Sequence, residues 1–374
     1  MTADGSQQNY KPGGAPDPRG VRGTFTRHRE EAMALGSGID TYILKTVEWC
    51  NLDCTYCYYY HGADDSFLRR PRYLDLDIVR EAVPKIIAHS QKHGVDHIDV
   101  TLHGGEPLLQ PRDECAGLMQ ILDDIDAAGI TTRRKVTTNG VLFDEEWARL
   151  LSQWDCLVGF SIDGPERIHD AARVDHAGRG SYLRVIRGLE VALGWHRRGL
   201  LVGTLSVVNP QLSGTEAYRH LRSLGVELMN FLLPESNYAS PPPHAGTELA
   251  PYGRFLSEVF DAWVDEDNDT VEIRALAEAI KALTTAGASD SDQFGDAPVR
   301  VAVLETDGSI EPTDNLKACE NGLTDLGLNV YLNDFDDLYE HPVFAASLND
   351  SAVKPVECHT CRHFATCGAG RLTN

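Results

Sequence analysis

Three cysteines lie close together in the first third of the chain, in the run Cys50-Asn-Leu-Asp-Cys54-Thr-Tyr-Cys57. Soft thiolates of this kind bind iron–sulfur clusters or zinc. An iron–sulfur cubane ordinarily takes four cysteines, but no fourth cysteine lies nearby in the sequence. Three thiolates would leave one iron open to a small chelating molecule. The spacing therefore indicates a cluster with an open position.

Two simpler interpretations of this run remain. Positions i, i+4 and i+7 share one face of a helix, where cysteine can pack as a small hydrophobic residue. A zinc site is the other alternative. A structural zinc ion is held by four protein ligands, so three cysteines without a fourth ligand nearby fit a zinc site less well.

A second group of cysteines lies near the end of the chain. It consists of Cys358-His-Thr-Cys361, of Cys367 before Gly-Ala-Gly, and of Cys319 upstream. These four thiols would satisfy an auxiliary iron–sulfur cluster or a tetrahedral zinc ion equally well.

The elements that must position these groups alternate along the chain. Apolar β-type runs alternate with amphipathic helical stretches, which predicts a parallel sheet wrapped by crossover helices. The expected strands are 42–47, 97–102, 134–138, 156–162, 200–208 and 227–233, and the expected helices lie near 76–93, 112–128, 144–153, 180–198 and 213–224. This order predicts an α/β fold, a partial (β/α)6 TIM barrel. Further helices near 249–265 and 271–286 and a β-hairpin over 299–311 follow.

Short polar motifs follow the second, third and fourth expected strands. They are His103-Gly104-Gly105-Glu106-Pro107, Thr137-Thr138-Asn139-Gly140 and Ser161-Ile162-Asp163-Gly164-Pro165. Barrel active sites are built at the carboxyl ends of the strands, where the first cysteines are also expected. Paired glycines let a backbone approach a ligand closely, and a carboxylate can accept hydrogen bonds from an ammonium group. Taken singly, each motif is also a common turn.

The cysteine run, with Tyr56 before its last cysteine, resembles the signature of the radical S-adenosylmethionine (SAM) superfamily. The resemblance implies that Cys50, Cys54 and Cys57 hold a [4Fe–4S] cluster that cleaves SAM reductively to a 5′-deoxyadenosyl radical. It implies contact of the glycine-glycine-glutamate-proline motif with the SAM amino group, of Ser161 and Asp163 with the ribose, and of Arg173 with the SAM carboxylate. The implied SAM-binding residues are Tyr56, Gly104, Gly105, Glu106, Pro107, Thr138, Asn139, Ser161, Asp163 and Arg173. For Arg173, a surface salt bridge is the alternative.

The tail resembles the SPASM domain, which binds auxiliary iron–sulfur clusters in peptide-modifying radical SAM enzymes. Thr313 and Arg371 stand where relatives often carry cysteines, and the chain ends at Asn374. We therefore expect one auxiliary [4Fe–4S] cluster, held by Cys319, Cys358, Cys361 and Cys367, rather than two.

The stretch from Glu305 to Cys319 resembles maturases of ribosomally made peptides, including cyclophane-forming ones. The resemblance implies a precursor peptide as substrate, a crosslink between an aromatic ring and a side-chain β-carbon, and a flavodoxin- or ferredoxin-type electron donor. Formylglycine formation, as in sulfatase maturation, and peptide epimerisation or thioether formation are alternatives. In sulfatase-maturing relatives the acid that matches Asp314 takes a substrate proton. Outside the enzymes, a zinc-binding or electron-transfer module is the alternative.

Composition narrows the class of protein further. The formal net charge of -22 over 374 residues argues against a nucleic-acid partner. No apolar run approaches the ~18 residues that span a membrane, and the polar start lacks a secretory signal pattern, so we expect a cytoplasmic protein. The expected organisation is an N-terminal extension (1–39), the barrel (40–235), a helical bridge (236–296) and a SPASM-like domain (297–374).

Overall fold

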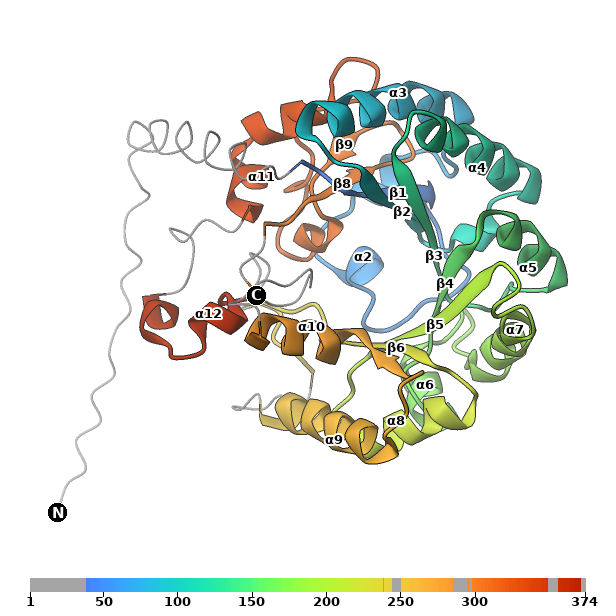
Figure 1. Cartoon of the computed structure of the whole chain (residues 1–374), viewed down its shortest axis with the longest axis vertical. Coiled ribbons are helices and arrows are strands. Elements are labelled where there is room, and N and C mark those ends of the chain that lie inside the picture. Colours follow the sequence, from blue (N-terminus) through green and yellow to red (C-terminus); the bar gives the residue numbers. More distant parts are fainter. Residues whose placement is uncertain are drawn as a thin grey trace.

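The computed structural model describes residues 38–237, 239–243, 250–284, 295, 298–348 and 356–370. Their centre is a nine-stranded sheet in the order β7-β6-β5-β4-β3-β2-β1-β8-β9. The first six strands each pair in parallel with their sequence neighbour, which confirms the predicted partial barrel (Figure 1). They are β1 (Thr41–Val47), β2 (His97–Gly104), β3 (Thr131–Thr138), β4 (Cys156–Ser161), β5 (Leu200–Val207) and β6 (Leu228–Leu232).

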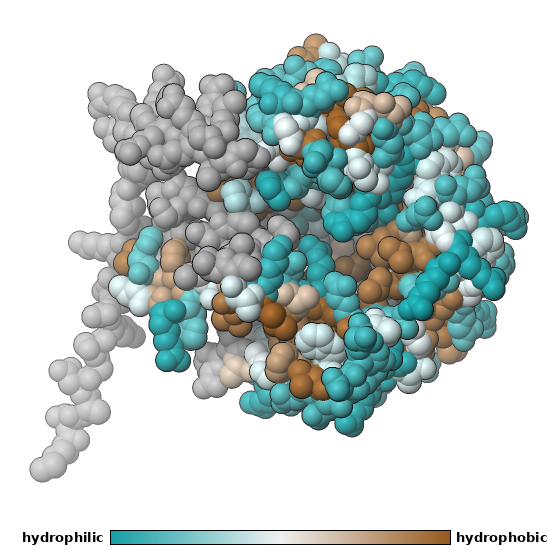
Figure 2. All heavy atoms as spheres, in the orientation of Figure 1, coloured by the Kyte–Doolittle hydropathy of each residue, from teal (hydrophilic) through white to brown (hydrophobic). Residues whose placement is uncertain are grey.

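Helices connect these strands and cover the outside of the curved sheet (Figure 1). They are α3 (Leu76–His93), α4 (Arg112–Ala127), α5 (Glu145–Leu151), α6 (Glu166–Ala172), α7 (Tyr182–Gly194) and α8 (Gly214–Ser223). Figure 2 shows mainly hydrophilic residues over the outer helices and hydrophobic residues around the hollow within the ring of strands. The sequence missed α6 as a separate helix and the short α2 (Tyr58–His61), which follows the first cysteines.

Side-chain caps define where two of the helices begin. The Asp75 side chain accepts a hydrogen bond from the backbone N–H of Asp77 at the start of α3, and Ser213 accepts one from Glu216 at the start of α8. Gly94 ends α3 in the left-handed region at φ +66°, as expected of a residue without a Cβ.

The sheet continues beyond the six predicted strands at both edges. The short β7 (Glu272–Ile273) pairs with β6, and β8 (Val301–Leu304) lies parallel to β1. The strand β9 (Ile310–Glu311) returns antiparallel to β8, which confirms the predicted hairpin. The pairing of β8 with β1 was not predicted. This pairing brings the 3-10 helix η4 (Asp314–Ala318) next to the first strand of the barrel.

A buried ionic network fastens the hairpin to the segment before α3. Arg70, from the 3-10 turn region η1 (Ser66–Arg69), lies 3.2 Å from the Glu305 carboxylate and pairs with Glu311. Lys317 Nζ lies 2.8 Å from the other oxygen of Glu311. All four side chains are almost fully buried, and removal of one member would leave an uncompensated buried charge. The network therefore fixes η4 in place.

The remaining elements are two short turns within the barrel, η2 (Pro107–Leu109) and η3 (Ser152–Trp154), and the elements that follow β6. The latter are α9 (Ala250–Glu266), α10 (Arg274–Thr284), α11 (Pro342–Ser347), α12 (Phe364–Cys367), η5 (Phe335–Glu340) and η7 (Val356–Thr360). The helices α9 and α10 confirm the two expected in the bridge. No helix among the described residues combines the length and the apolar character that crossing a membrane requires. The expected extension lies outside the described residues up to position 37, as do Arg371 and Asn374.

Candidate active site

The loop between β1 and α2 carries the first three cysteines, and hydrogen-bond donors are aimed at their sulfur atoms. The backbone N–H of Leu52 and the side-chain amide of Asn139 lie 3.4 and 3.5 Å from Cys50 Sγ. Arg173 Nη1 lies 4.0 Å from Cys54 Sγ. Burial raises the pKa of Cys50 to about 12 and that of Cys54 to about 11. Donors around buried sulfur stabilise thiolates once a metal centre supplies positive charge, so these residues fit an iron–sulfur cluster.

The separation of the three thiols distinguishes a cluster from a single zinc ion. Tetrahedral zinc with bonds of about 2.3 Å requires sulfur atoms about 3.8 Å apart. Within the described part of the chain, the only group with three ligand atoms all within 4.8 Å of one another is His89, His93 and Asp336. At least two of the thiols of Cys50, Cys54 and Cys57 therefore lie more than 4.8 Å apart, farther than two ligands of one bound zinc ion.

Gly104 and Gly105 lie against the cysteine loop. A Cβ on Gly104, which has φ +135°, would lie 2.2 Å from the Val47 carbonyl oxygen, and one on Gly105 would lie 2.1 Å from that of Trp49. The Gly105 N–H donates to Val47 at 2.7 Å, and the Glu106 N–H donates to Trp49 at 3.0 Å. The two glycines thus let the loop after β1 pack onto the end of β2. Their contact with SAM stays a prediction.

The Glu106 carboxylate joins the ends of β2 and β3. It accepts hydrogen bonds from Thr138 Oγ1 and the backbone N–H of Asn139, both at 2.6 Å, and from Leu108 N–H at 3.0 Å. Burial raises the pKa of Glu106 to about 7 despite these donors. Pro107 begins η2 directly after it. The structure therefore brings together the glutamate motif, the Thr138-Asn139 pair and Cys50, as the sequence predicted.

Asp163 forms a second junction on the other side of the cysteine loop. Its Oδ2 accepts hydrogen bonds from Tyr56 Oη at 2.5 Å and from Arg173 Nε at 3.0 Å, while Oδ1 accepts the Val207 N–H at 3.1 Å. Burial would lower the pKa of Arg173, but the attraction of the Asp163 carboxylate is stronger and raises this pKa. Arg173 is only 8% exposed, so the surface salt-bridge alternative is wrong. Ser161 closes β4, and no described side-chain contact ties it to this junction.

His169 supports Arg173 from behind. Its Nε2 lies 2.9 Å from Ser181 Oγ, and this hydroxyl donates to the backbone carbonyl of Arg173 at 2.7 Å. Burial lowers the pKa of His169 to about 4, so the ring is neutral at pH 7. The stretch His169-Asp170-Ala-Ala-Arg173 thus places its arginine through a side chain that does not itself reach the cysteines.

Asp314 lies in η4 beside β1, with partners that sequence reasoning missed. It forms an ion pair with Lys45 of β1 and accepts a hydrogen bond from Tyr58 Oη at 3.1 Å. Lys45 Nζ also lies 3.3 Å from His103 Nδ1. Burial would raise the pKa of Asp314, but the Lys45 ammonium outweighs it and holds that pKa well below its usual range. The available signal for Lys45 was a lysine inside the apolar run of the first strand.

A cavity of about 610 Å³ opens beside the cysteine loop. Its lining includes Cys57 and Tyr58, Asp163, and Glu235 and Cys319. Residues 234–237 form part of its wall and are tied to η4, because Asn315 Nδ2 donates to Glu235 at 2.6 Å and Asn237 Nδ2 donates to the Ala318 carbonyl at 3.0 Å. Space for a substrate side chain therefore lies next to the first cysteines.

The four expected auxiliary ligands are not brought together by any described contact. Cys319 lies at the cavity, Cys358 lies on η7, and Cys361 and Cys367 are exposed near α12. As in the first group, no three of these thiols within the described ranges lie within 4.8 Å of one another. Their joint ligation of a cluster stays a prediction.

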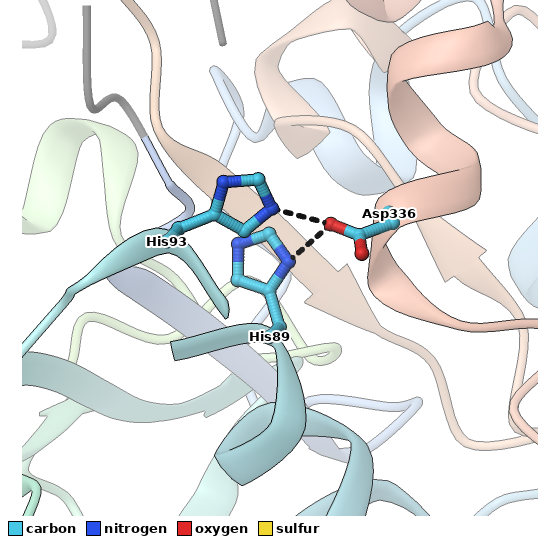
Figure 3. Close-up of side chains that lie close together, drawn as sticks. All are labelled: His89, His93 and Asp336. Atoms are coloured by element: carbon cyan, nitrogen blue, oxygen red, sulfur yellow. Dashed lines mark hydrogen bonds and ion pairs between the residues drawn. The ribbon is translucent and has the colours of Figure 1, made fainter. Parts of the chain in front are cut away.

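A further group of ligand-type side chains lies between α3 and η5 (Figure 3). His89 Nδ1 and His93 Nε2, one turn apart on α3, lie 2.8 and 2.7 Å from one oxygen of Asp336 on η5. The Ile39 N–H donates to His89 Nε2 at 2.9 Å, so this nitrogen is unprotonated and Nδ1 carries the proton. A metal on Nδ1 would put the proton on Nε2, against the Ile39 N–H. We therefore interpret the group as an anchor between α3, η5 and the start of β1.

Comparison with known proteins places this geometry in context. Residues 44–213 match the family model of the Radical SAM superfamily. The chain is 25% identical over 332 residues to a cysteine-type anaerobic sulfatase-maturating enzyme of Clostridium perfringens, and the match covers 86% of the chain and 85% of that enzyme. Its fold resembles native anSMEcpe with bound AdoMet (TM-score 0.74, 23% identity, 89% of each chain). It also resembles Streptococcus suis SuiB bound to its precursor peptide SuiA (TM-score 0.61, 15% identity, 99% and 80% covered).

Proposed function

We propose that this chain, whose residues 44–213 form a radical SAM domain, is an enzyme that oxidises a Cys or Ser side chain of a peptide or protein substrate to formylglycine. Its cofactors are a [4Fe–4S] cluster and SAM. When bound, they supply a 5′-deoxyadenosyl radical that abstracts a hydrogen atom from the substrate.

In this proposal, different residues around the cysteine loop bind the cluster and SAM. Cys50, Cys54 and Cys57 hold the cluster through three thiolates. The donors at their sulfur atoms and the separation of the thiols support this assignment. The junctions at Glu106 and Asp163 flank the same loop, so SAM would lie between them, near the residues that the superfamily resemblance implied.

One observation carries the choice of reaction: a carboxylate held in its charged form lies directly behind the cavity wall. Tyr58 lines the cavity and donates a hydrogen bond to Asp314, which Lys45 pairs from the other side. Oxidation of a Cys or Ser side chain to the oxidation level of an aldehyde removes a hydrogen atom from Cβ, a proton from the thiol or hydroxyl, and one electron. A buried carboxylate is a suitable acceptor for that proton.

The electron that leaves the substrate needs an acceptor. We propose an auxiliary [4Fe–4S] cluster with Cys319, Cys358, Cys361 and Cys367 as ligands, because Cys319 lines the same cavity as Cys57. A flavodoxin- or ferredoxin-type protein would supply the electron for SAM cleavage. Zinc is the alternative occupant of the tail.

Cyclophane crosslinking of a precursor peptide, the first expectation from the sequence, is the second candidate. SuiB, whose fold is similar, was solved bound to its precursor peptide, which supports a peptide as the substrate. Several relatives by sequence are sulfatase-maturating enzymes, so the comparisons support formylglycine formation better than crosslinking.

Mass spectrometry of candidate substrates tests the proposal. The anaerobically reconstituted protein is incubated with SAM, a reductant and a peptide carrying a single Cys, and in parallel with its Ser variant. Formylglycine removes two hydrogens from Ser, and at Cys it also exchanges sulfur for oxygen, so an aldehyde-reactive hydrazide should label the product. A loss of two hydrogens that resists the hydrazide and joins two residues in fragmentation spectra would support crosslinking instead. Unchanged mass with every peptide would contradict both.

A further inference from the structure

We propose that Lys45 is a positioning residue that keeps Asp314 in its carboxylate form and directs Oδ1 of this carboxylate to the substrate proton. The inference deepens the proposed function and rests on it for the identity of the substrate. Nothing in the sequence motifs assigns a role to Lys45, which lies two residues before the end of β1 and five residues before Cys50.

The surroundings of Lys45 require a charged ammonium group. Its side chain is fully buried. Its three N–H bonds meet three acceptors: the Asp314 carboxylate, His103 Nδ1 at 3.3 Å, and the face of the Tyr59 ring, whose centroid lies 4.5 Å away. A neutral amine would direct a lone pair at one of these electron-rich groups. The arrangement therefore uses every donor of the ammonium form.

His103 is compatible with this arrangement because its ring is neutral. Burial, and next to it the Lys45 charge, lower the pKa of His103 to about 4. With the proton on Nε2, the lone pair on Nδ1 accepts from Lys45. His103 thus fixes the direction of the ammonium group without adding a second positive charge.

The hydrogen bonds of Asp314 are distributed unevenly between its two oxygens. Both Lys45 Nζ and Tyr58 Oη bond to Oδ2. Across the part of the chain that the structure describes, no hydrogen bond reaches Oδ1. A carboxylate whose one oxygen is occupied by two donors presents the other as its proton-accepting atom.

The charge balance around the pair decides how Asp314 ionises. Lys45 is the closest cation, and Lys317 of the same 3-10 helix adds a weaker attraction. The negative charges of Asp314 and Glu235 both act on Tyr58. The titratable and charged groups around Asp314 and its two partners, Lys45 and Tyr58, are His103, Tyr59, Lys317 and Glu235. Without Lys45, no other cation in this set contacts the carboxylate, and burial would favour its protonated form.

The balanced step follows from this geometry. After one Cβ hydrogen atom of the substrate Cys or Ser has gone to the 5′-deoxyadenosyl radical, the S–H or O–H bond breaks. Its proton goes to Asp314 Oδ1, and one electron leaves to an iron–sulfur acceptor. A carbon–sulfur or carbon–oxygen double bond forms. The thioaldehyde formed from Cys then exchanges sulfur for oxygen with water and releases hydrogen sulfide.

The first experiment needs no substrate. The melting temperature of the reconstituted protein is measured between pH 5 and pH 8.5 for wild type, Lys45→Met, Asp314→Asn and the double variant. In Lys45→Met the folded-state pKa of Asp314 should rise above its unfolded value, so stability should fall as pH rises through that window. The melting temperature of this variant should drop by several degrees across the window relative to the double variant, which lacks both charges. Parallel curves for the two variants would overturn the proposal.

The second experiment measures catalysis with the Cys peptide of the preceding section. Formylglycine is quantified per 5′-deoxyadenosine at each pH. Lys45→Met should form about 100-fold less product per 5′-deoxyadenosine at pH 7, in the range of general-base losses. The ratio should recover by about tenfold per pH unit as Asp314 regains its charge. Asp314→Asn should lose about as much formylglycine per 5′-deoxyadenosine as Lys45→Met, and the ratio should not recover as the pH rises. Lys45→Arg should retain most of the product.

Lys135→Met is the matched control, because Lys135 also pairs with a carboxylate, Asp99, but on β2 and β3 away from the cavity. It should leave the product ratio unchanged. A loss in Lys45→Met that is equal at every pH would mean a structural role only and would overturn the proposal. If wild type converts no peptide, formylglycine formation fails, while the melting series still decides whether Lys45 sets the charge of Asp314. If Lys45→Met does not fold, Lys45→Gln, which is also uncharged but can still donate a hydrogen bond, is compared with Lys45→Gln/Asp314→Asn in the same way.

Discussion

Thr138 Oγ1 donates a 2.6 Å hydrogen bond to the carboxylate of Glu106, and this contact joins the carboxyl ends of β2 and β3. The next residue, Asn139, bonds the same carboxylate through its backbone and Asn51 through its side chain at 2.7 Å. One buried glutamate thereby connects two barrel strands to the cysteine loop.

Replacement of Glu106 by Gln should therefore disturb both the loop and its pH response. The three donors at this site all point to an acceptor, so the Gln amide would face at least one donor with its own NH2 group, at a cost of about 1–3 kcal/mol. Burial raises the pKa of Glu106 to about 7. Its contribution to the free energy of unfolding is present below its unfolded pKa and is lost as pH rises towards 7.

Unfolding measured from pH 4.5 to pH 7.5 checks this prediction. The stability of wild type should decline over this window relative to Glu106→Gln, whose curve should be flatter. SAM binding by Glu106→Gln, measured by equilibrium dialysis, should weaken at least about tenfold. Unchanged binding and an identical pH slope would contradict the role assigned to the carboxylate.

The Arg173 side chain should be irreplaceable by lysine. Its guanidinium spans from the Asp163 carboxylate at 3.0 Å to Cys54 Sγ at 4.0 Å, and a single ammonium cannot make both contacts. Arg173→Lys should lower the rate of 5′-deoxyadenosine formation by about 10- to 100-fold with iron content retained. Arg167→Lys, at an exposed pair with Glu216, is the control and should change the rate by less than about twofold. Equal rates for both variants would refute the assignment.

Gly104 should tolerate alanine less well than another glycine with positive φ. At Gly104 a Cβ would lie 2.2 Å from the Val47 carbonyl, whereas at Gly129, with φ +87°, nothing lies within 4 Å. Both variants carry the strain of a left-handed alanine, about 1 kcal/mol, but only Gly104→Ala displaces the cysteine loop. Denaturant unfolding should show the larger loss for Gly104→Ala, together with reduced iron after reconstitution. Full iron content in that variant would show that the close packing is dispensable.

Substitutions in the two groups of cysteines should have different effects on SAM cleavage and on product formation. Alanine at Cys50, Cys54 or Cys57 should abolish cleavage of SAM, because each thiol is expected to hold one iron. Alanine at Cys358 should lower the iron content but leave slow SAM cleavage intact, and it should stop product formation. Cys115→Ala serves as the control, since Cys115 is buried on α4 away from both groups. Zinc in place of iron in purified wild-type protein, with no sulfide, would contradict both cluster assignments.

The order of local patterns determined much of the fold. Alternating strand and helix periods predicted β1 to β6 and the connecting helices, because hydrophobic periodicity is a local property of the chain. Caps such as Asp75 and Ser213 were readable for the same reason. The motifs at the strand ends predicted the site as well, since parallel strands necessarily gather their carboxyl ends at one face.

The tertiary structure alone decided which groups pair across that face. The pairing of β8 with β1 brings Asp314 to Lys45 across 269 residues of sequence, and no spacing rule encodes such a contact. The tertiary structure also showed that Gly104 and Gly105 leave room for the cysteine loop. These outcomes depend on the packing of distant segments and on the mutual neutralisation of buried charges, and both arise only when the chain has folded.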